Sequence, residues 1–479
     1  MGVPVGMVNR RAFWDACPSV LSDDQVDATR IPAQTFADTI ADFHTRIDAL
    51  SPAVAATIEK IRNGAPIVRL AHQPNLFPHL NLLAQIYYVD YLTEHRPDVA
   101  PVVLIVDQDD VSDRWLHTSL SWSRDAPGTL VRHSTKPYLP NRRRIISRTR
   151  LAVDAVVRVQ AAAAHYLSTL SPQRSPEHWR SLLWPRQHRE CSDVDLTEFH
   201  SAPLVRSLAN THGLPTAFCP LSRLYTRAGP AASLILNRLV ELDPAFRDHL
   251  PLWSVCDSCS TRNDLTALGD DYLSRCRVCG SEAKFPVTDL LLDPERFPST
   301  RTAPKVLLDT LLDYTALPTL GGSNYLGGRS HLEVSTALAA ELFGWSPLEA
   351  CWRGNPVDSS VIDRDISARV RLSAPAHRAA HAHLTGRISM LSMLTDENML
   401  TRLRDAVSEK ADRMTSGHPD AVTLVLDRDS MWLNDPSLKD FRERITGSVD
   451  NERSAREIGS GPGARGHRLE QVHDAGHHG

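Results

Sequence analysis

The chain has 479 residues, of which 53 are basic and 57 acidic, so its formal net charge at pH 7 is -4. This balance gives no overall electrostatic reason to expect nucleic-acid binding. Hydrophobic residues make up 42% of the chain, an ordinary content for a globular protein, and no apolar run approaches the roughly 20 residues that cross a bilayer. Because 479 residues exceed one ordinary core, we expect a main domain with insertions and appendages.

The N-terminal part of the chain is expected to be helical. Phe36, Ile40 and Phe43 recur at helical spacing, and this pattern predicts one packing helix from Pro32 to about Ile61. The first residues lack the apolar core and the small-residue cleavage site of a secretory signal peptide. We therefore expect a cytoplasmic protein without a membrane partner.

Residues 65–113 carry the pattern of a β-loop-α-β unit. Two aliphatic runs, at 66–71 and 102–106, lack polar alternation, as expected of parallel strands buried on both faces. Apolar residues recur at helical spacing between them. Because crossovers between parallel strands are right-handed, the polar loops His72–His79 and Asp107–Asp113 should emerge at the same carboxyl edge of one sheet. Ligands of open α/β sheets bind at that edge.

The strongest local signal is a pair of CxxC motifs. Each motif can present two sulfurs to one ion, and the linker between them has zinc-ribbon length; the four thiols are those of Cys256, Cys259, Cys276 and Cys279. Four protein thiolates leave no open coordination position, so the predicted zinc is structural. A redox-active CxxC is one alternative. Nucleic-acid contact is another, through the nearby basic residues Arg262, Arg275, Arg277 and Lys284, although ribbons often only brace a domain.

A glycine-rich stretch follows at residues 317–331 and predicts a loop that opens a helix at Leu332–Phe343. Glycines let backbone amides approach an anion, and a helix N-terminus adds a favourable dipole. A set of tight turns explains the glycines equally well. Glu349–Arg353 is predicted to be one more strand, and the residues from Pro375 to Met414 are predicted to be helical.

These patterns predict an α/β protein with six parts. They are an N-terminal helical segment (1–64), the first part of the core (65–251), a zinc-ribbon insertion (252–286), the second part of the core (287–372), a helical arm and C-terminal segment (373–447) and a disordered tail (448–479).

Three separated stretches together resemble the bacillithiol biosynthesis cysteine-adding enzyme family (BshC), whose core is similar to that of class I aminoacyl-tRNA synthetases. The stretches are Ala71–Phe77 before a helix, the strand ending in Asp107–Asp110, and the series Pro294–Phe297, Val306–Asp313, Leu317–Thr319 and Tyr325–Gly328. They follow the family's order and cover roughly residues 30–370. His72 and Asn75 stand where the family has Gln and Gly, and Asp109 stands where its acidic cluster has histidine.

The resemblance implies a Rossmann-like parallel sheet of the class I synthetase type. It also implies a ligase that joins an amino acid, cysteine in the family, to an amine-bearing small molecule in thiol or specialised metabolism. Such a reaction needs an activated carboxylate, usually an adenylate, so ATP and Mg²⁺ are expected beside structural zinc. A tRNA-binding synthetase paralogue and a non-catalytic scaffold remain alternatives, and a homodimer is one candidate assembly.

The carboxyl edge would carry this chemistry. We assign catalysis to His72, Asp107 and Asp109: the histidine would donate to charge developing on the α-phosphoryl group, and the carboxylates would bind the substrate amine or magnesium or act as a base. We assign substrate or nucleotide binding to Gln73, Asn75, His79, Asp110, Asn324, Gly327, Gly328, Arg329 and His331. Each residue has a simpler alternative role as a cap or a loop-stabilising group.

Overall fold

The computed structural model describes residues 23–78, 80–94, 97–111, 114–122, 130–139, 144–324, 342, 348–351, 391, 394 and 397–415. These residues lie in the first of two compact units, Met1–Ser430 and Met431–Gly479. Several sequence predictions fall outside the described residues: His79, Gly327, Gly328, Arg329, His331, nearly all of the helix at 332–343 and the tail at 448–479.

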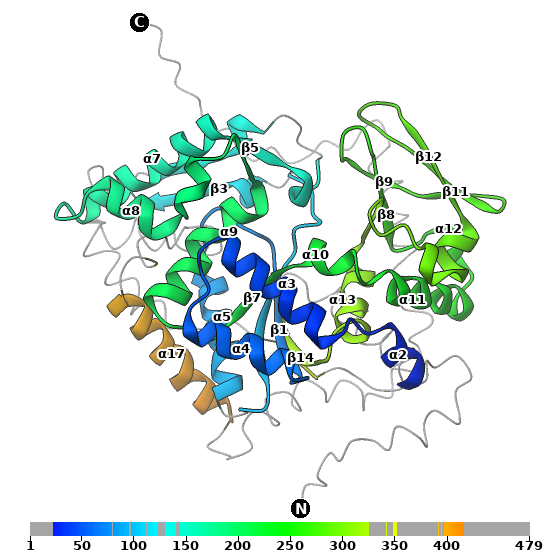
Figure 1. Ribbon diagram of the computed structural model, residues 1–479, viewed down its shortest axis with the longest axis horizontal. Coiled ribbons are helices and arrows are strands. Elements are labelled where there is room, and N and C mark those ends of the chain that lie inside the picture. The colour runs from blue at the N-terminus through cyan, green and yellow to red at the C-terminus, as the bar shows by residue number, and fades with distance from the viewer. Residues whose placement is uncertain are drawn as a thin grey trace, which may run out of the picture. The chain divides into compact units, whose positions relative to one another are not determined.

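Five strands form one central sheet (Figure 1). They are β1 (Ile67–His72), β2 (Ala100–Ile105), β7 (Ala217–Pro220), β14 (Thr319–Asn324) and β15 (Leu348–Cys351). Their order across the sheet is β15-β14-β1-β2-β7, and each neighbouring pair is parallel. Numbered along the chain, this is the order 3-2-1-4-5 of a doubly wound sheet. The predicted parallel α/β core is confirmed.

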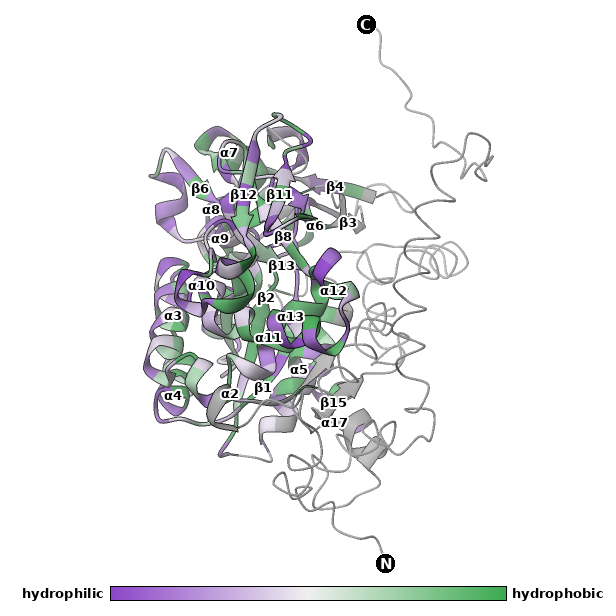
Figure 2. Ribbon diagram, turned by 90° about the vertical axis from the view of Figure 1, so that its right-hand side faces the viewer, coloured by the Kyte–Doolittle hydropathy of each residue, from purple (hydrophilic) through white to green (hydrophobic). Residues whose placement is uncertain are grey.

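The strands of this sheet are buried because helices cover them. All six residues of β2 are buried, as are the first four of β1. The crossover helix α5 (Leu80–Glu94) packs on β1 and β2, while α3 (Ala33–Arg46) packs on β7 and α4 (Pro52–Arg62) on β2 and β7. In Figure 2 the hydrophobic colouring follows β2 and α13 (Val306–Thr315), whereas α3 and α4 show hydrophilic residues. The core therefore lies between the sheet and the inner helix faces.

The single helix predicted from Pro32 to Ile61 is wrong, because two helices occupy this range. α3 ends at Arg46 and α4 begins at Pro52. Asp48 between them has a φ of 54°, a left-handed conformation that no α-helix continues through. Ser51 then caps α4, accepting a hydrogen bond from the Val54 backbone N–H at 3.3 Å. The apolar residues keep helical spacing across this break, so the sequence pattern does not reveal it.

The predicted glycine-rich loop is also partly wrong, since Thr319–Asn324 is strand β14. This strand pairs with β1 on one side and with β15 on the other. Glycine disfavours strands when considered alone, but a place between two parallel partners supplies hydrogen bonds along both edges. The predicted strand at 349–353 is confirmed as β15, at Leu348–Cys351.

Helix α2 (Asp23–Thr29) precedes α3. Much of the remaining chain lies between β2 and β7 or follows β7. These elements are α6 (Arg114–His117), β3 (Thr118–Trp122), β4 (Leu130–Ser134), η1 (Lys136–Tyr138), η2 (Ile146–Arg148), β5 (Arg150–Ala152), α7 (Val153–Leu170), α8 (Pro176–Leu183), η3 (Arg186–Arg189), β6 (Asp193–Asp195), α9 (Leu196–Arg206), η4 (Ser207–Thr211), α10 (Leu221–Tyr225), α11 (Gly229–Leu242), α12 (Ala245–Asp248), η5 (Thr288–Leu292) and η6 (Pro294–Arg296).

The CxxC region forms a small β module. Its strands are β8 (Leu252–Val255), β9 (Arg262–Asp264), β10 (Thr266–Leu268), β11 (Asp271–Arg275) and β12 (Glu282–Pro286). They form two three-stranded sheets, β10-β11-β12 and β13-β8-β9, and the second includes β13 (Thr302–Pro304) from beyond residue 286. Since β13 directly precedes α13, the module shares a sheet with the second part of the core.

The C-terminal helix α17 (Glu397–Thr415) lies within the region predicted to form a helical arm, but it packs on α5. Arg404 of α17 pairs with the buried carboxylate of Asp90 at 3.4 Å. Leu400, Leu403 and Val407 are buried at this contact. This part of the predicted arm is therefore attached to the core. Within the described ranges, no helix is both long and apolar enough to cross a membrane.

Candidate functional site

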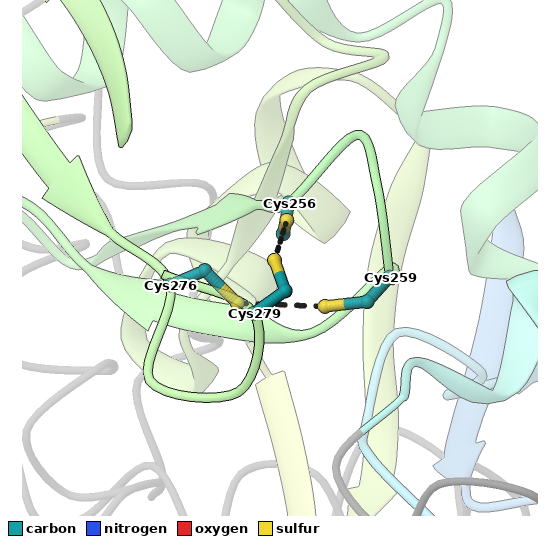
Figure 3. Close-up of side chains that lie close together, drawn as sticks. All are labelled: Cys256, Cys259, Cys276 and Cys279. Atoms are coloured by element: carbon teal, nitrogen blue, oxygen red, sulfur yellow. Dashed lines mark hydrogen bonds between the residues drawn. The ribbon is translucent and has the colours of Figure 1, made fainter. Parts of the chain in front are cut away.

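The four cysteines of the CxxC motifs converge in the β module (Figure 3). The Sγ atoms of Cys256 and Cys279 are 3.4 Å apart, as are those of Cys259 and Cys276, and all four lie within 4.8 Å of one another. Four sulfurs placed tetrahedrally about 2.3 Å from a zinc ion would be about 3.8 Å apart. The donor set and its spacing therefore fit a metal such as zinc, and four thiolates leave no position for substrate.

Two matching turns present these thiols. In the first turn the Ser260 N–H donates to the carbonyl of Cys256 at 2.8 Å, and in the second the Gly280 N–H donates to Cys276 at 2.9 Å. Both residues that follow the second cysteine have a positive φ, 57° at Ser260 and 76° at Gly280. The module thus folds two sequence-distant motifs into equivalent turns around one point.

The local environment favours the thiolate form at two of the four sulfurs, those of Cys276 and Cys279, whereas burial raises the pKa of the Cys259 thiol to about 11. Hydrogen bonds from Ser281 lower the pKa of the Cys279 thiol to about 6. The Val278 backbone N–H also donates to the Cys276 sulfur at 3.4 Å. Among the described residues, no other group of His, Cys, Asp and Glu has the spacing of metal ligands.

The carboxyl edge of the sheet brings together the polar loops after β1 and β2, as predicted. His72, the last residue of β1, lies beside Ile105 of β2, and Asp107 follows two residues later. The His72 Nδ1–H donates to the Gln73 carbonyl at 2.8 Å, while burial lowers the pKa of the ring. In this contact the proton lies on Nδ1, and burial favours the neutral ring. The role of His72 as a phosphate donor stays a prediction.

Asp107 is buried, with an exposed fraction of 1%, and its carboxylate is fully engaged. It accepts hydrogen bonds from the Ser222 backbone N–H at 2.8 Å, the Ser222 hydroxyl at 2.6 Å and the Thr197 hydroxyl at 3.2 Å. Burial raises the pKa of this carboxyl, and the hydrogen bonds oppose that shift. Asp107 therefore joins the acidic loop to α9 and α10, and its catalytic role stays a prediction.

Asp109 and Asp110 are partly buried and bind an arginine that comes from the β module. Arg262 of β9 donates to Asp109 at 2.9 Å and to Asp110 at 3.1 Å. Gln73 of the β1 loop donates its side-chain amide to the other oxygen of Asp109. The structure therefore brings three of the predicted site residues together, and it adds a cation that sequence reasoning had assigned only to a surface of the ribbon.

Helix α13 contributes carboxylates that sequence reasoning missed. Asp313 pairs with Arg69 of β1 at 2.7 Å, and both side chains are buried. Asp309 lies one turn earlier on the same helix, and among the described residues its carboxylate makes no hydrogen bond or ion pair. Burial, followed by the charge of Asp313, raises the pKa of Asp309 well above its ordinary value; Arg69 opposes the shift, and the charges of Asp109 and Asp107 add to it. The helical pattern alone gave no signal for this proximity.

A buried histidine of α9 is hydrogen-bonded to the loop that follows β1. The His200 Nδ1–H of α9 donates to the carbonyl of Pro74 at 2.9 Å, and its Nε2 pairs with the Thr135 hydroxyl at 3.0 Å. Burial lowers the pKa of His200 to about 3, so the ring is neutral. Within the loop, the Asn75 backbone N–H donates to the carbonyl of Gln73 at 2.9 Å. The loop is thereby held in one conformation at the edge of the sheet.

The fourth strand of the doubly wound order ends at the same edge. Leu70 of β1 lies beside Ser323, so Asn324 follows at the carboxyl end of β14, next to the β1 loop.

Neither a scan against protein-family models nor a search of curated proteins finds a match for this chain.

Proposed function

We propose that this protein is a ligase that joins an amino acid to an amine-bearing small molecule, with its active site at the carboxyl edge of the parallel sheet. The resemblance to the bacillithiol cysteine-adding family and to class I synthetases motivates the reaction. The observation that carries the proposal is the strand order 3-2-1-4-5, which reverses between β1 and β14. Open α/β sheets bind ligands where the order reverses.

The carboxylates at this position suit a substrate that carries an amine. In the proposed reaction, the carboxylate of the amino acid attacks the α-phosphorus of ATP and pyrophosphate leaves. The acceptor amine then attacks the acyl carbon, AMP leaves with the bonding electrons, and a base takes the proton of the amine. Asp309 is our candidate base, because its raised pKa moves this otherwise unpaired carboxyl toward the range in which general bases work.

Other edge residues take positioning roles in this proposal. Gln73 and Arg262 hold Asp109 from two sides, so its carboxylate can orient the amino group of a substrate without swinging into the site. Asp107 fixes the loop through Ser222 and Thr197. Asn324 lies at the end of β14, where backbone groups can approach the nucleotide.

The test is amino-acid-dependent nucleotide turnover. Purified full-length protein would be incubated with ATP, magnesium and each of the twenty amino acids, with and without amine acceptors, and pyrophosphate and products would be followed by mass spectrometry. We expect turnover with one amino acid and a loss of at least about 100-fold in Asp309→Asn and Asp109→Asn, as is typical when an acid–base or orienting group is removed. Asp38→Asn, at an exposed carboxylate of α3, is the matched control.

One observation favours the scaffold alternative instead. Asp107, Asp109 and Asp110 all have partners within the chain, which is also what purely structural carboxylates would show. A nucleotide-binding titration on the same samples separates the two functions. If ATP fails to bind at millimolar concentration and no amino acid or acceptor restores turnover, the ligase proposal is wrong and the scaffold stands.

The structure adds nothing in favour of a tRNA-binding paralogue. The four basic residues of the module each pair with a carboxylate of this chain: Arg262 with Asp109 and Asp110, Arg275 with Glu282, Arg277 with Asp264 and Lys284 with Asp271. Arg262, the least exposed of them, points into the protein and away from any external phosphate backbone.

A further inference from the structure

The first metal-binding turn touches a segment that leads to the acidic loop. The Ile145 backbone N–H donates to the carbonyl of Ser260 at 2.9 Å, and the Arg144 side chain donates to the carbonyl of Cys259 at 3.3 Å. Arg144 and Thr261 also form an isolated antiparallel bridge. The turn that carries two of the four thiols is therefore joined by hydrogen bonds to residues 144–145.

The same segment holds the acidic loop along its length. The Ile146 N–H donates to the carbonyl of Asp109, and the Ser147 N–H to that of Asp107, each at 2.9 Å. In the opposite direction, the Val111 N–H donates to the carbonyl of Arg144 at 3.0 Å. Residues 144–147 thus lie between the metal-binding turn and residues 107–111, and they are bonded to both.

Arg262 makes the second connection, and it is a direct one. It follows the first turn in sequence and donates to both Asp109 and Asp110, as well as to the carbonyl of Gln108 at 3.3 Å. Its guanidinium lies over the ring of Trp253, 5.3 Å from the centroid. Because Trp253 belongs to β8, this contact keeps the arginine with the module when the module moves relative to the acidic loop.

The first turn contains a strained backbone conformation, which a metal bound to Cys256 and Cys259 would hold in place. Ser260 has a φ of 57°, a left-handed conformation that is unfavourable for a residue with a side chain. It is the carbonyl of this residue that receives the bond from Ile145. Without an ion to fix Cys256 and Cys259, relaxation of Ser260 would rotate that carbonyl away from its donor.

We propose that the four-cysteine metal centre controls the candidate ligand site: bound metal fixes the first turn and Arg262, and through them sets the conformation and charge of residues 107–111. Metal loss releases the acidic loop while the parallel sheet beneath it stays folded. The proposal holds for any reaction at this edge, because it concerns contacts within the chain. Arg262 is accordingly a positioning residue.

Hydrogen–deuterium exchange of the full-length protein tests this connection. Three samples would be compared: zinc-loaded protein, the same protein after chelation, and zinc-loaded Arg262→Gln. The reporting amides are those of Val111, Ile145, Ile146 and Ser147. We expect about tenfold faster exchange at these amides on chelation. We expect a similar change at Val111 in Arg262→Gln, with one zinc per chain retained, because a hydrogen bond to a charged group is lost.

The control variant is Arg275→Gln, which removes an exposed arginine of the same module that pairs only with Glu282. It should leave exchange in residues 107–111 and 144–147 unchanged, and peptides from β1 and β2 serve as the internal reference. Unchanged exchange at residues 107–111 in Arg262→Gln overturns the proposal. If chelation unfolds the whole chain, the reference peptides will show it, and the zinc-loaded variants decide the matter alone.

Discussion

The β module and the carboxyl edge of the sheet gather charged groups in opposite ways. The module takes its four thiols from two short motifs within residues 256–279, each presented by its own turn. The edge takes its charged residues from β1, the β2 loop, the module and α13, across residues 69–313. A site whose ligands are local in sequence is visible as a motif, whereas one assembled from distant elements needs the fold.

The two regions also differ in how their charges are balanced. The module holds four thiols that together fit one divalent ion. At the edge, the carboxylates outnumber the cations that face them among the residues that the structure describes: Asp107, Asp109, Asp110, Asp309 and Asp313 against Arg69 and Arg262. Burial raises the pKa of Asp107, Asp309 and Asp313, and clusters of groups with a shifted pKa are frequent at functional sites. The comparison therefore supports the proposal that the edge, and not the module, is the ligand site.

Removing a thiolate from the module should have the largest effect on stability. Cys276 is buried, so Cys276→Ser leaves three ligands around a position built for four. We expect loss of bound metal and a decrease in the free energy of unfolding on the order of 5 kcal/mol, because metal binding and folding of such modules are coupled. Elemental analysis and thermal unfolding measure the two quantities.

Cys191→Ser is the matched control for this substitution, since Cys191 is an exposed cysteine outside the cluster. It should retain the metal and change stability by no more than about 0.5 kcal/mol. Full metal occupancy in Cys276→Ser would contradict the four-thiolate centre and leave the module as a plain β structure.

The edge should show the next largest effect, at its buried ion pair. Asp313→Asn leaves Arg69 charged and without its partner inside the protein, and such a break costs about 3–5 kcal/mol. The exposed pair of Arg150 and Asp193 has the same 2.7 Å separation. Asp193→Asn should cost less than about 1 kcal/mol, because water screens that pair. Denaturant unfolding of both variants compares a buried with an exposed ion pair at the same separation. If both substitutions lower the free energy of unfolding by the same amount, burial does not strengthen the pair of Arg69 and Asp313.

Part of this picture was accessible from sequence. The CxxC spacing predicts the metal centre because each motif fixes two ligands through a single turn. The aliphatic runs at residues 66–71 and 102–106 predict buried parallel strands, since strands buried on both faces lack alternation. Right-handed crossovers then place both polar loops at one edge. These inferences depend on local pattern and on general rules of topology.

The rest depended on contacts that no local pattern encodes. Nothing in the residues around Asp107 indicates that Ser222 would satisfy its carboxylate from 115 positions away. The ribbon arginine Arg262 has the appearance of a surface residue until the fold directs it onto Asp109. Glycines at 321 and 322 predict a loop, and only their place between β1 and β15 makes them a strand. The assignment of roles in the site therefore needs contacts between residues that lie far apart in the sequence.

Asp309 offers a pH-dependent test of the charge imbalance at the edge. Its pKa is raised in the folded protein above its unfolded value, so its ionisation opposes folding, and stability falls as the pH rises from about 4 through the raised pKa. Asp309→Asn removes this cost. The variant should unfold at a higher temperature than the parent at pH 8, and the difference should shrink as the pH falls toward 5.

The slope of this difference cannot exceed about 1.4 kcal/mol per pH unit, the value for one proton. Asp38→Asn should show no such gain, because hydrogen bonds from Gln34 and Arg62 lower the pKa of Asp38 and give its linkage the opposite sign. If Asp309→Asn destabilises the protein at pH 8, the carboxylate has a stabilising partner and is not the unpaired group of the proposed site.

The smallest effect separates the two turns of the module from each other. Ser260 and Gly280 occupy equivalent positions and both have a positive φ, but only Ser260 has a side chain that this conformation penalises. Ser260→Gly should therefore raise the free energy of unfolding by about 0.5–1 kcal/mol, and Gly280→Ser should lower it by a similar amount. Thermal unfolding of zinc-loaded variants measures both changes. If Ser260→Gly does not raise the free energy of unfolding, the left-handed conformation of Ser260 carries no strain in the zinc-loaded protein. The position of the Ser260 carbonyl would then be set by the turn alone and not by the metal.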